Sequence, residues 1–126
     1  MDVLIIEGDE LVRSVLAETL DAERISATGA SDEEALMLPS NDAPQMVITG
    51  INRGHDEDLK GLEVVAALRR KWPQLCAVYL AAVWPARLHR EMLGDGERFL
   101  MKPVALSQLT RTVRELLRSG LSRVKP

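Results

Sequence analysis

The sequence has few aromatic residues, one cysteine and no long hydrophobic run. Aromatic residues make up 3% of the 126 residues, and the single cysteine, Cys76, has no second cysteine with which to form an internal disulfide. Cys76 lies in an apolar run, which predicts a packed core thiol. No apolar run approaches the roughly 20 residues that span a bilayer, so no membrane association is expected. No basic-then-apolar leader precedes the first predicted strand, and we therefore expect a cytoplasmic protein.

Positive charge is scarce in the first two thirds of the chain. Residues 1–85 carry 7 Lys/Arg against 15 Asp/Glu, whereas residues 86–126 carry 9 against 4. The acidic part argues against a general nucleic-acid-binding domain, while the basic third suits contact with an acidic partner. The apolar fraction of 46% and charged fraction of 28% are typical of a globular protein. We expect one domain over residues 1–119, followed by a basic tail or the start of a linker at 120–126.

Short apolar runs alternate with segments of helical periodicity along the chain. Runs at 3–6, 46–50 and 76–82 predict strands buried on both faces, with further strands at 25–28 and 98–101. Helices are expected over 11–20, 31–38, 61–72, 86–93 and 106–119. Ser31 and Glu34 form a capping-box signature at the start of the second of these. The alternation predicts an α/β fold with a doubly wound parallel sheet.

The helix expected over 106–119 has the clearest amphipathic pattern. Its predicted core face is apolar, and its opposite face is basic. The apolar face comprises Leu106, Leu109, Val113, Leu116 and Leu117, and the basic face comprises Arg111, Arg114 and Arg118.

The central strand, 46–50, ends at a residue that has no functional group. In an open parallel sheet, ligands bind beyond the carboxyl ends of the strands. Gly50 stands at that end, where a reactive side chain would be expected. An acidic segment containing Glu7 and Asp9 follows the first strand, and Lys102-Pro103 follows the last one. The candidate site is therefore charged at its sides and lacks a side chain at its centre.

The order of these features resembles a bacterial response-regulator receiver domain, of the CheY-like kind, over residues 3–117. The residues that carry the match are Glu7 and Asp9, the strand 46–50, the segment 61–65 and the segment 99–103. The resemblance implies a flavodoxin-like, three-layer (βα)5 sandwich with strand order 2-1-3-4-5. It also implies a cis peptide bond between Lys102 and Pro103, and a place in two-component phosphorelay signalling.

In that family a histidine kinase passes a phosphoryl group to an aspartate at the end of the third strand. This chemistry needs a carboxylate nucleophile, a divalent cation, a lysine and a hydroxyl group. By position, the nucleophile falls on Gly50, the second metal ligand on Gly8 and the hydroxyl on Ala81, so all three are lost. The first metal ligand, Glu7, and the lysine, Lys102, are retained.

We therefore interpret the chain as a pseudo-receiver, with no catalytic residue and no enzyme activity. No metal site is expected, and Mg²⁺ binding should be weak or absent, because a single carboxylate is a poor Mg²⁺ site. The retained pocket residues are Glu7, Asp9, Lys102 and Pro103. Asp9 lies one residue out of register with the lost ligand at Gly8. Loss of two carboxylates leaves Glu7 and Lys102 as natural partners, so we expect a direct or water-mediated contact between them.

Further candidates are expected at switch and interface positions. Phe99 falls on the family's aromatic switch position. Trp84, just after the fourth strand, is either an interface anchor or packs onto the fourth helix or Pro85. Arg111, Arg114 and Arg118 form either a solvated face or part of a homodimer surface. In this family that surface consists of the fourth helix, fifth strand and fifth helix.

The favoured function is a protein-interaction module in two-component signalling that binds a histidine kinase or a regulator domain. We expect no nucleic-acid binding by this domain. The alternatives are a working phospho-switch that uses Asp9 or Asp56 as acceptor, and a receiver fragment of a longer regulator. A flavodoxin-like protein that binds a small molecule has little support, because no glycine-rich phosphate loop follows the first strand.

Overall fold

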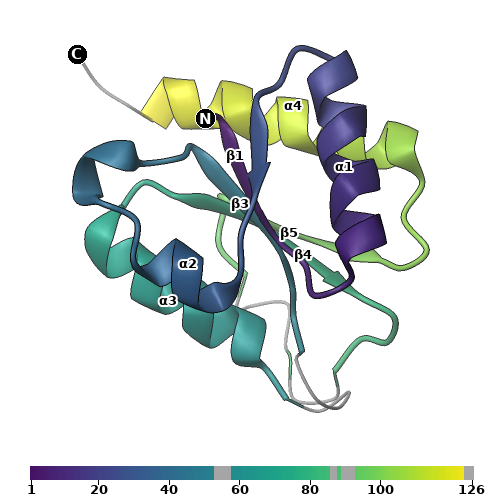
Figure 1. The fold of residues 1–126 in the computed structure, drawn as a ribbon, viewed down its shortest axis with the longest axis horizontal. Coiled ribbons are helices and arrows are strands. Elements are labelled where there is room, and N and C mark those ends of the chain that lie inside the picture. Colours follow the sequence, from purple (N-terminus) through teal and green to yellow (C-terminus); the bar gives the residue numbers. More distant parts are fainter. Residues whose placement is uncertain (53–57, 86–87, 89–92, 124–126) are drawn as a thin grey trace.

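The computed structural model describes residues 1–52, 58–85, 88 and 93–123, and it contains one five-stranded sheet (Figure 1). All neighbouring strands pair in parallel, in the order β2-β1-β3-β4-β5. This confirms the predicted fold class and strand order. The strands are β1 (Val3–Ile6), β2 (Ala27–Gly29), β3 (Met46–Gly50), β4 (Cys76–Ala81) and β5 (Glu97–Met101).

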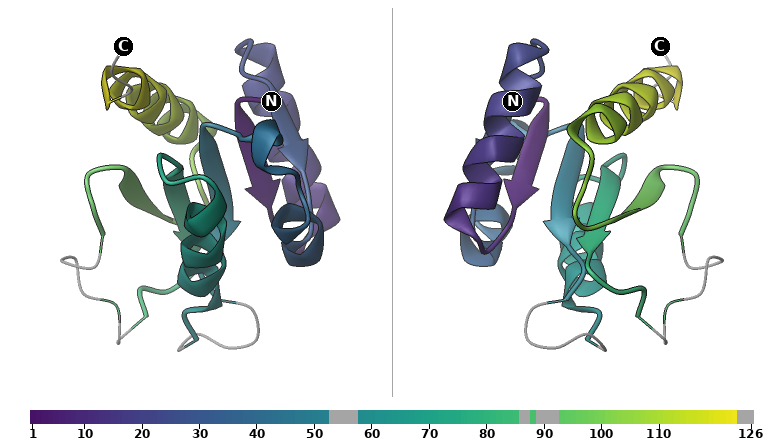
Figure 2. Two further views of the ribbon diagram at one scale, coloured as in Figure 1. Left: turned by 90° about the vertical axis from the view of Figure 1, so that its left-hand side faces the viewer. Right: turned by 90° about the vertical axis from the view of Figure 1, so that its right-hand side faces the viewer.

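Helices cover both faces of the sheet, which makes a three-layer sandwich (Figure 2). Buried residues of α1 (Glu10–Ala22) and α4 (Leu106–Arg123) pack on one face. Those of α2 (Asp32–Leu36) and α3 (Lys60–Lys71) pack on the other, and a short 3₁₀ helix, η1 (Ser40–Asp42), precedes β3. The helix predicted over 86–93 falls mostly outside the described residues. No helix in the described part of the chain is long and apolar enough to cross a membrane.

The central strands are buried on both faces, as their uninterrupted apolar runs predict. All four residues of β1 and all six of β4 are buried. Cys76 is 2% exposed, which confirms the prediction of a packed core thiol. Since β1, β3 and β4 adjoin one another, their carboxyl ends meet at one edge of the sheet, where a site is expected.

Side-chain caps fix where two of the helices begin. The Ser31 hydroxyl accepts from the Glu34 amide at 3.1 Å, and the Glu34 carboxylate accepts from the Ser31 amide at 2.9 Å, so the predicted capping box is confirmed. The Asp9 carboxylate caps α1 by accepting from the backbone amides of Leu11 and Val12. These local bonds position the segments that follow β1 and β2.

Several element boundaries differ from the predictions, and local structure explains those of β2 and of the last helix. β2 begins at Ala27, not at residue 25, because the Ile25 amide donates to Leu20 O at the end of α1 and is not available to the sheet. The last helix extends to Arg123 and does not end at residue 119, so it enters the predicted tail. Gly120 does not stop this helix, because a glycine inside a helix costs only about 1 kcal/mol relative to alanine.

Leu106 also departs from its predicted place in the core. Its side chain is 43% exposed, while Leu109, Val113 and Leu116 are fully buried as predicted. The periodicity therefore gives the correct core face of α4, but Leu106, the first residue of the helix, lines a groove beside α1.

The first turn of α3 passes very close to the chain that leaves β3. The Gly61 amide donates to Ile51 O at 2.7 Å. A Cβ atom added to Gly61 would lie 2.8 Å from the Ile51 Cα and closer still to Gly50 O. Only glycine fits this contact, which sets the position of the backbone at the end of β3.

A polar network joins α3, β4 and β5 within the sandwich. The Tyr79 hydroxyl donates to Glu97 Oε2 at 2.6 Å, and Arg69 Nη1 lies 3.2 Å from the same oxygen. The Gly94 amide donates to Glu97 Oε1 at 2.8 Å. The guanidinium of Arg69 also donates to Leu75 O. Each polar group that these residues bury therefore has a partner, as low-dielectric surroundings require.

Candidate functional site

The carboxyl ends of the central strands enclose a cavity of about 250 Å³. Glu7 and Gly8 follow β1, Gly50 ends β3, Ala81 ends β4 and Lys102 follows β5. The structure thus brings together the five positions that the sequence predicts for the site. The cavity is lined by Ile6, Glu7, Gly8, Gly50, Asn52, Leu80, Ala81, Ala82 and Lys102.

Glu7 and Lys102 form an ion pair across the cavity. Lys102 Nζ lies 3.1 Å from Glu7 Oε2, and the two side chains are 36% and 10% exposed, respectively. The second carboxylate oxygen, Glu7 Oε1, accepts from the Asp9 amide at 3.3 Å. This confirms the predicted contact, and it is direct. The retained acid and the retained lysine therefore satisfy each other.

Asp9 does not contribute its carboxylate to the cavity. Asp9 Oδ1 accepts from the amides of Leu11 and Val12 at 2.9 and 3.2 Å, at the N-terminus of α1. Backbone amides at a helix N-terminus favour a carboxylate, so this arrangement is stable. Asp9 is thus a helix cap beside the pocket and does not replace the ligand missing at Gly8.

Pro103 follows a cis peptide bond with Lys102, as the resemblance implies. The Lys102 amide donates to Ala81 O at 2.8 Å, which ties the exit of β5 to the end of β4. The cis peptide bond and this hydrogen bond together set the position of the Lys102 backbone, from which its side chain extends.

The side chains at the cavity do not fit the Mg²⁺ ion that the receiver resemblance implies. Mg²⁺ requires near-octahedral oxygen ligands, commonly with one or two carboxylates. Here the carboxylate of Glu7 is paired with Lys102, and Gly8 and Gly50 have no side chain. Within the described ranges, no group of three or more His, Cys, Asp or Glu is arranged to hold a metal.

The space at Gly8 is open. A Cβ atom added there would meet no atom within 4 Å. The missing carboxylate is therefore not excluded by crowding, and a larger side chain would be accommodated at this position.

Trp84 packs against Phe99, so the two aromatic candidates form one contact. Their ring centroids lie 4.4 Å apart with an interplanar angle of 60°, and the Trp84 indole donates to Leu88 O at 2.7 Å. Both side chains are partly buried. Of the two alternatives, the packed one describes Trp84 better, because its ring contacts Phe99 and its indole bonds to Leu88, a residue of the predicted fourth helix.

The three arginines of α4 are exposed and lie beside α1. Arg111, Arg114 and Arg118 line a groove together with Thr19 and Glu23 of α1. Arg114 Nη2 lies 2.7 Å from Glu23 Oε2. The sequence pattern shows that these residues face away from the core, but not which neighbouring helix they approach. Their exposure agrees with the solvated-face alternative, and the homodimer surface of the fourth helix, fifth strand and fifth helix stays a prediction.

Four lining residues, Ile6, Asn52, Leu80 and Ala82, were not predicted as site residues from the sequence. Ile6 and Leu80 lie at the ends of β1 and β4, and Asn52 and Ala82 lie just after β3 and β4. The rule that sites lie beyond the carboxyl ends of strands would have identified Asn52 and Ala82. The Arg13 guanidinium, which donates to Glu7 O at 3.2 Å, comes from the first turn of α1 and has no comparable local signal.

The ion pair makes a testable contribution to stability. A Lys102→Met variant is expected to lose about 1–2 kcal/mol of unfolding free energy, because it leaves the mostly buried carboxylate of Glu7 without its cation. The double variant Glu7→Gln with Lys102→Met should recover most of this loss, and urea denaturation measures both. Equal stability of the Lys102→Met variant and the wild type would show that the pair contributes nothing.

Solved structures similar to this chain include receiver domains. A response regulator receiver protein from Sinorhizobium medicae matches with a TM-score of 0.77 and 24% identity, over 94% of each chain. The Francisella response regulator 1452 receiver domain matches at 0.76 and 21%, over 93% of this chain and 96% of that one. Vibrio cholerae chemotaxis protein CheY4 matches at 0.72 and 20%, over 90% and 96%. At this identity the likeness establishes the fold, which is the CheY-like, flavodoxin-like one.

No family model matches the sequence, and no curated protein matches it.

Proposed function

We propose that this chain, which has the receiver-domain fold, acts as a protein-interaction module in two-component signalling without being phosphorylated at the end of β3. The observation that carries the proposal is the Glu7–Lys102 ion pair, 3.1 Å long, in a cavity lined by Gly8, Gly50 and Ala81. The groups that would react are absent, while the frame that holds them is intact.

Phosphoryl transfer to this cavity lacks its essential parts. Gly50 has no atom that can attack phosphorus, and Ala81 has no hydroxyl to bind the product. The Lys102 ammonium, which would attract a phosphoryl group, already pairs with Glu7. Each of these three facts disfavours phosphoryl transfer. The chain is therefore proposed not to be an enzyme. It is also proposed to bind Mg²⁺ weakly or not at all.

The proposed partners are signalling proteins, either a histidine kinase or a regulator domain. Support comes from the receiver-domain fold and from the exposed basic residues of α4. The acidic charge of residues 1–85 disfavours nucleic-acid binding by this domain. A cytoplasmic location would agree with such partners.

The alternative function is a phospho-switch with a different acceptor, Asp9 or Asp56. The Asp9 carboxylate already accepts from two amides of α1, which reduces its availability as a nucleophile. Asp56 lies outside the described residues. Incubation with acetyl phosphate distinguishes this alternative from the proposed function.

The protein should form no acyl phosphate when it is incubated with Mg²⁺ and acetyl phosphate. Intact mass, measured before and after treatment with hydroxylamine, reports a phosphoryl adduct on a carboxylate. The matched positive control is the triple variant Gly8→Asp, Gly50→Asp and Ala81→Thr, which restores both carboxylates and the hydroxyl beside Lys102. This variant is expected to gain a hydroxylamine-labile adduct.

An adduct on the wild-type protein would contradict the proposed function. The acceptor would then be identified by substitution, because Asp9→Asn would remove an adduct on Asp9 and Asp56→Asn would remove one on Asp56. An adduct on the triple variant alone shows that the cavity retains a phosphorylation-competent shape and lacks only the reacting groups.

A further inference from the structure

Two helices on one face of the sheet carry opposite charge. α1 and its C-cap residue contain four acidic residues and one arginine, and the acidic ones are exposed. Between residues 106 and 119, α4 contains three exposed arginines and one glutamate. The acidic stripe comprises Glu10, Glu18, Asp21 and Glu23, and the basic stripe comprises Arg111, Arg114 and Arg118.

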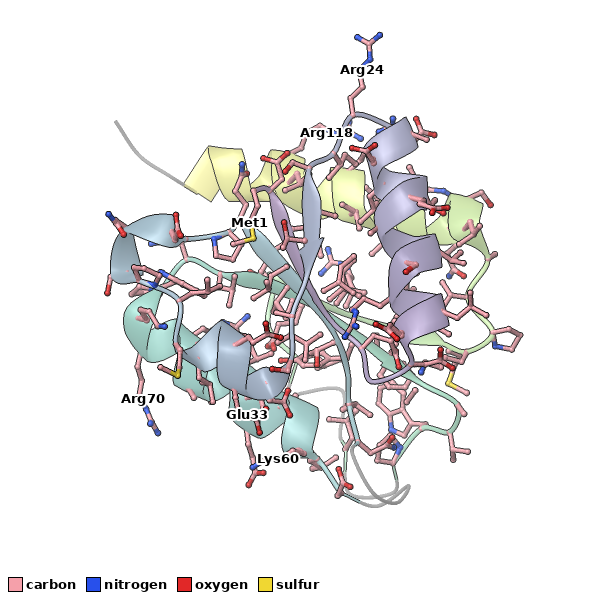
Figure 3. All side chains as sticks on the ribbon, in the orientation of Figure 1. Met1, Arg24, Glu33, Lys60, Arg70 and Arg118 are labelled. Atoms are coloured by element: carbon pink, nitrogen blue, oxygen red, sulfur yellow. The ribbon has the colours of Figure 1, made fainter. Side chains whose placement is uncertain are left out.

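A groove of about 490 Å³ runs between the two helices. All three arginines of the basic stripe line it, and Glu23 is the member of the acidic stripe that lines it, while the other acidic residues are exposed elsewhere on α1. At one end, Arg114 and Glu23 pair at 2.7 Å within the chain, and each side chain remains nearly half exposed. Figure 3 shows Arg118 on α4, on the opposite side of the molecule from Arg70 on α3. The remaining charges of both stripes have no ion pair in the described part of the chain, apart from the Glu10–Arg13 pair.

Apolar side chains are exposed on the same two helices. Leu11 is 74% exposed and Val15 is 41% exposed, one turn apart on α1. Leu106, in the first turn of α4, is 43% exposed and lines the groove. A face that combines exposed apolar residues with ordered charges is typical of an interaction surface.

We propose that the α1–α4 face binds a second copy of this chain through a two-fold axis. Such an axis places the acidic stripe of each copy on the basic stripe of the other, so that the face is complementary to itself. A purely acidic partner would meet the arginines but would also be repelled by α1. The charge pattern therefore favours another copy of the chain, and Leu11, Val15 and Leu106 would supply the apolar contact area.

This dimer differs from the one that the family resemblance suggests, because α1 takes the place of the fourth helix and the fifth strand in the contact. It also does not depend on the cavity at the end of β3. Failure of the dimer would leave the proposed signalling function intact, and phosphorylation of the chain would leave the dimer intact.

Charge reversal tests the proposed dimer. The α4 variant is Arg111→Glu with Arg118→Glu, and the α1 variant is Glu18→Arg with Asp21→Arg. Sedimentation equilibrium in low salt is expected to show a concentration-dependent dimer for the wild-type protein. Each variant alone should raise the dimer dissociation constant at least ~10-fold, because both contacts of a two-fold interface become repulsive. A 1:1 mixture of the two variants should restore the dimer, since every contact in the mixed pair is again between opposite charges.

The matched control is Arg70→Glu, a charge reversal on α3 that should leave the dissociation constant unchanged. Recovery in the mixture also shows that both variants are folded. Three results would overturn the proposal. They are a wild-type protein that stays monomeric at every concentration, an Arg70→Glu variant as weakened as the α4 variant, and a mixture that does not recover.

Discussion

A Gly61→Ala variant is expected to lose about 3 kcal/mol of unfolding free energy, measured by urea denaturation with an unchanged slope. The added Cβ would lie 2.8 Å from the Ile51 Cα and closer still to Gly50 O. Both neighbours are backbone atoms of the chain leaving β3, so they cannot rotate away as a side chain does. The first turn of α3 must move, and the bond from the Gly61 amide to Ile51 O at 2.7 Å weakens with it.

Gly8→Ala is the matched control for this substitution. The same methyl group at Gly8 meets no atom within 4 Å, so we expect a change of less than about 0.5 kcal/mol. Similar losses at the two positions would show that the close contact of α3 with the end of β3 does not limit stability. The Gly61 variant should also move the Gly50 carbonyl, which borders the site.

Glu97→Ala is expected to cost about 3 kcal/mol, since it removes one carboxylate from a network of three elements. Tyr79 is 1% exposed and would lose the acceptor of its hydroxyl. Arg69, whose side chain is 30% exposed, would lose its ion-pair partner. Tyr79→Phe is the milder comparison, because it removes a single hydroxyl and should cost about 1 kcal/mol. A thermal or urea melt measures both losses, and equal losses would contradict the central role of Glu97.

The contribution of Glu97 should also depend on pH. Burial alone would raise the pKa of this carboxyl, but the Gly94 amide, the Tyr79 hydroxyl and the Arg69 guanidinium together hold the pKa below its usual value. Burial and the nearby Glu97 raise the pKa of the Tyr79 hydroxyl, so Tyr79 stays protonated as the donor. The ionised form of Glu97 is therefore favoured by folding. Its stabilisation is complete above the unfolded pKa of about 4.3 and is lost as the pH falls through the lower folded value.

A Glu97→Gln variant isolates this effect. The stability difference between the wild-type protein and this variant should be constant from pH 8 to about pH 5 and should decrease below about pH 4. A difference that is the same at pH 3 and pH 7 would mean that the charge of Glu97 does not contribute.

The sequence was sufficient to predict what depends on local pattern. Uninterrupted apolar runs identified β1, β3 and β4, and the Ser31–Glu34 capping box located α2. The site was also predictable, because parallel strands bring their carboxyl ends together whatever the details of packing. Glu7 and Lys102 could therefore be paired before the structure was known, although they are 95 residues apart.

Features that depend on packing between distant segments were not predicted. The Tyr79–Glu97–Arg69 network joins three elements, and no spacing in the sequence signals it. Leu106 belongs to an apolar pattern but is the first residue of its helix and lines the groove beside α1. Arg111, Arg114 and Arg118 were placed correctly on the outer face of their helix, but their neighbour, α1, is set by how the two helices cross the sheet.

The two outermost strands have a consequence for aggregation. β2 is only three residues long, and it offers few free backbone groups to another chain. β5, at the other edge, carries Glu97 and Arg98, and the Arg98 guanidinium occupies the carbonyls of Asp95 and Glu97. Short and charged edge strands disfavour the addition of a foreign strand. We therefore expect the protein to resist amyloid-like assembly by sheet extension even at the high concentrations that reveal a weak dimer.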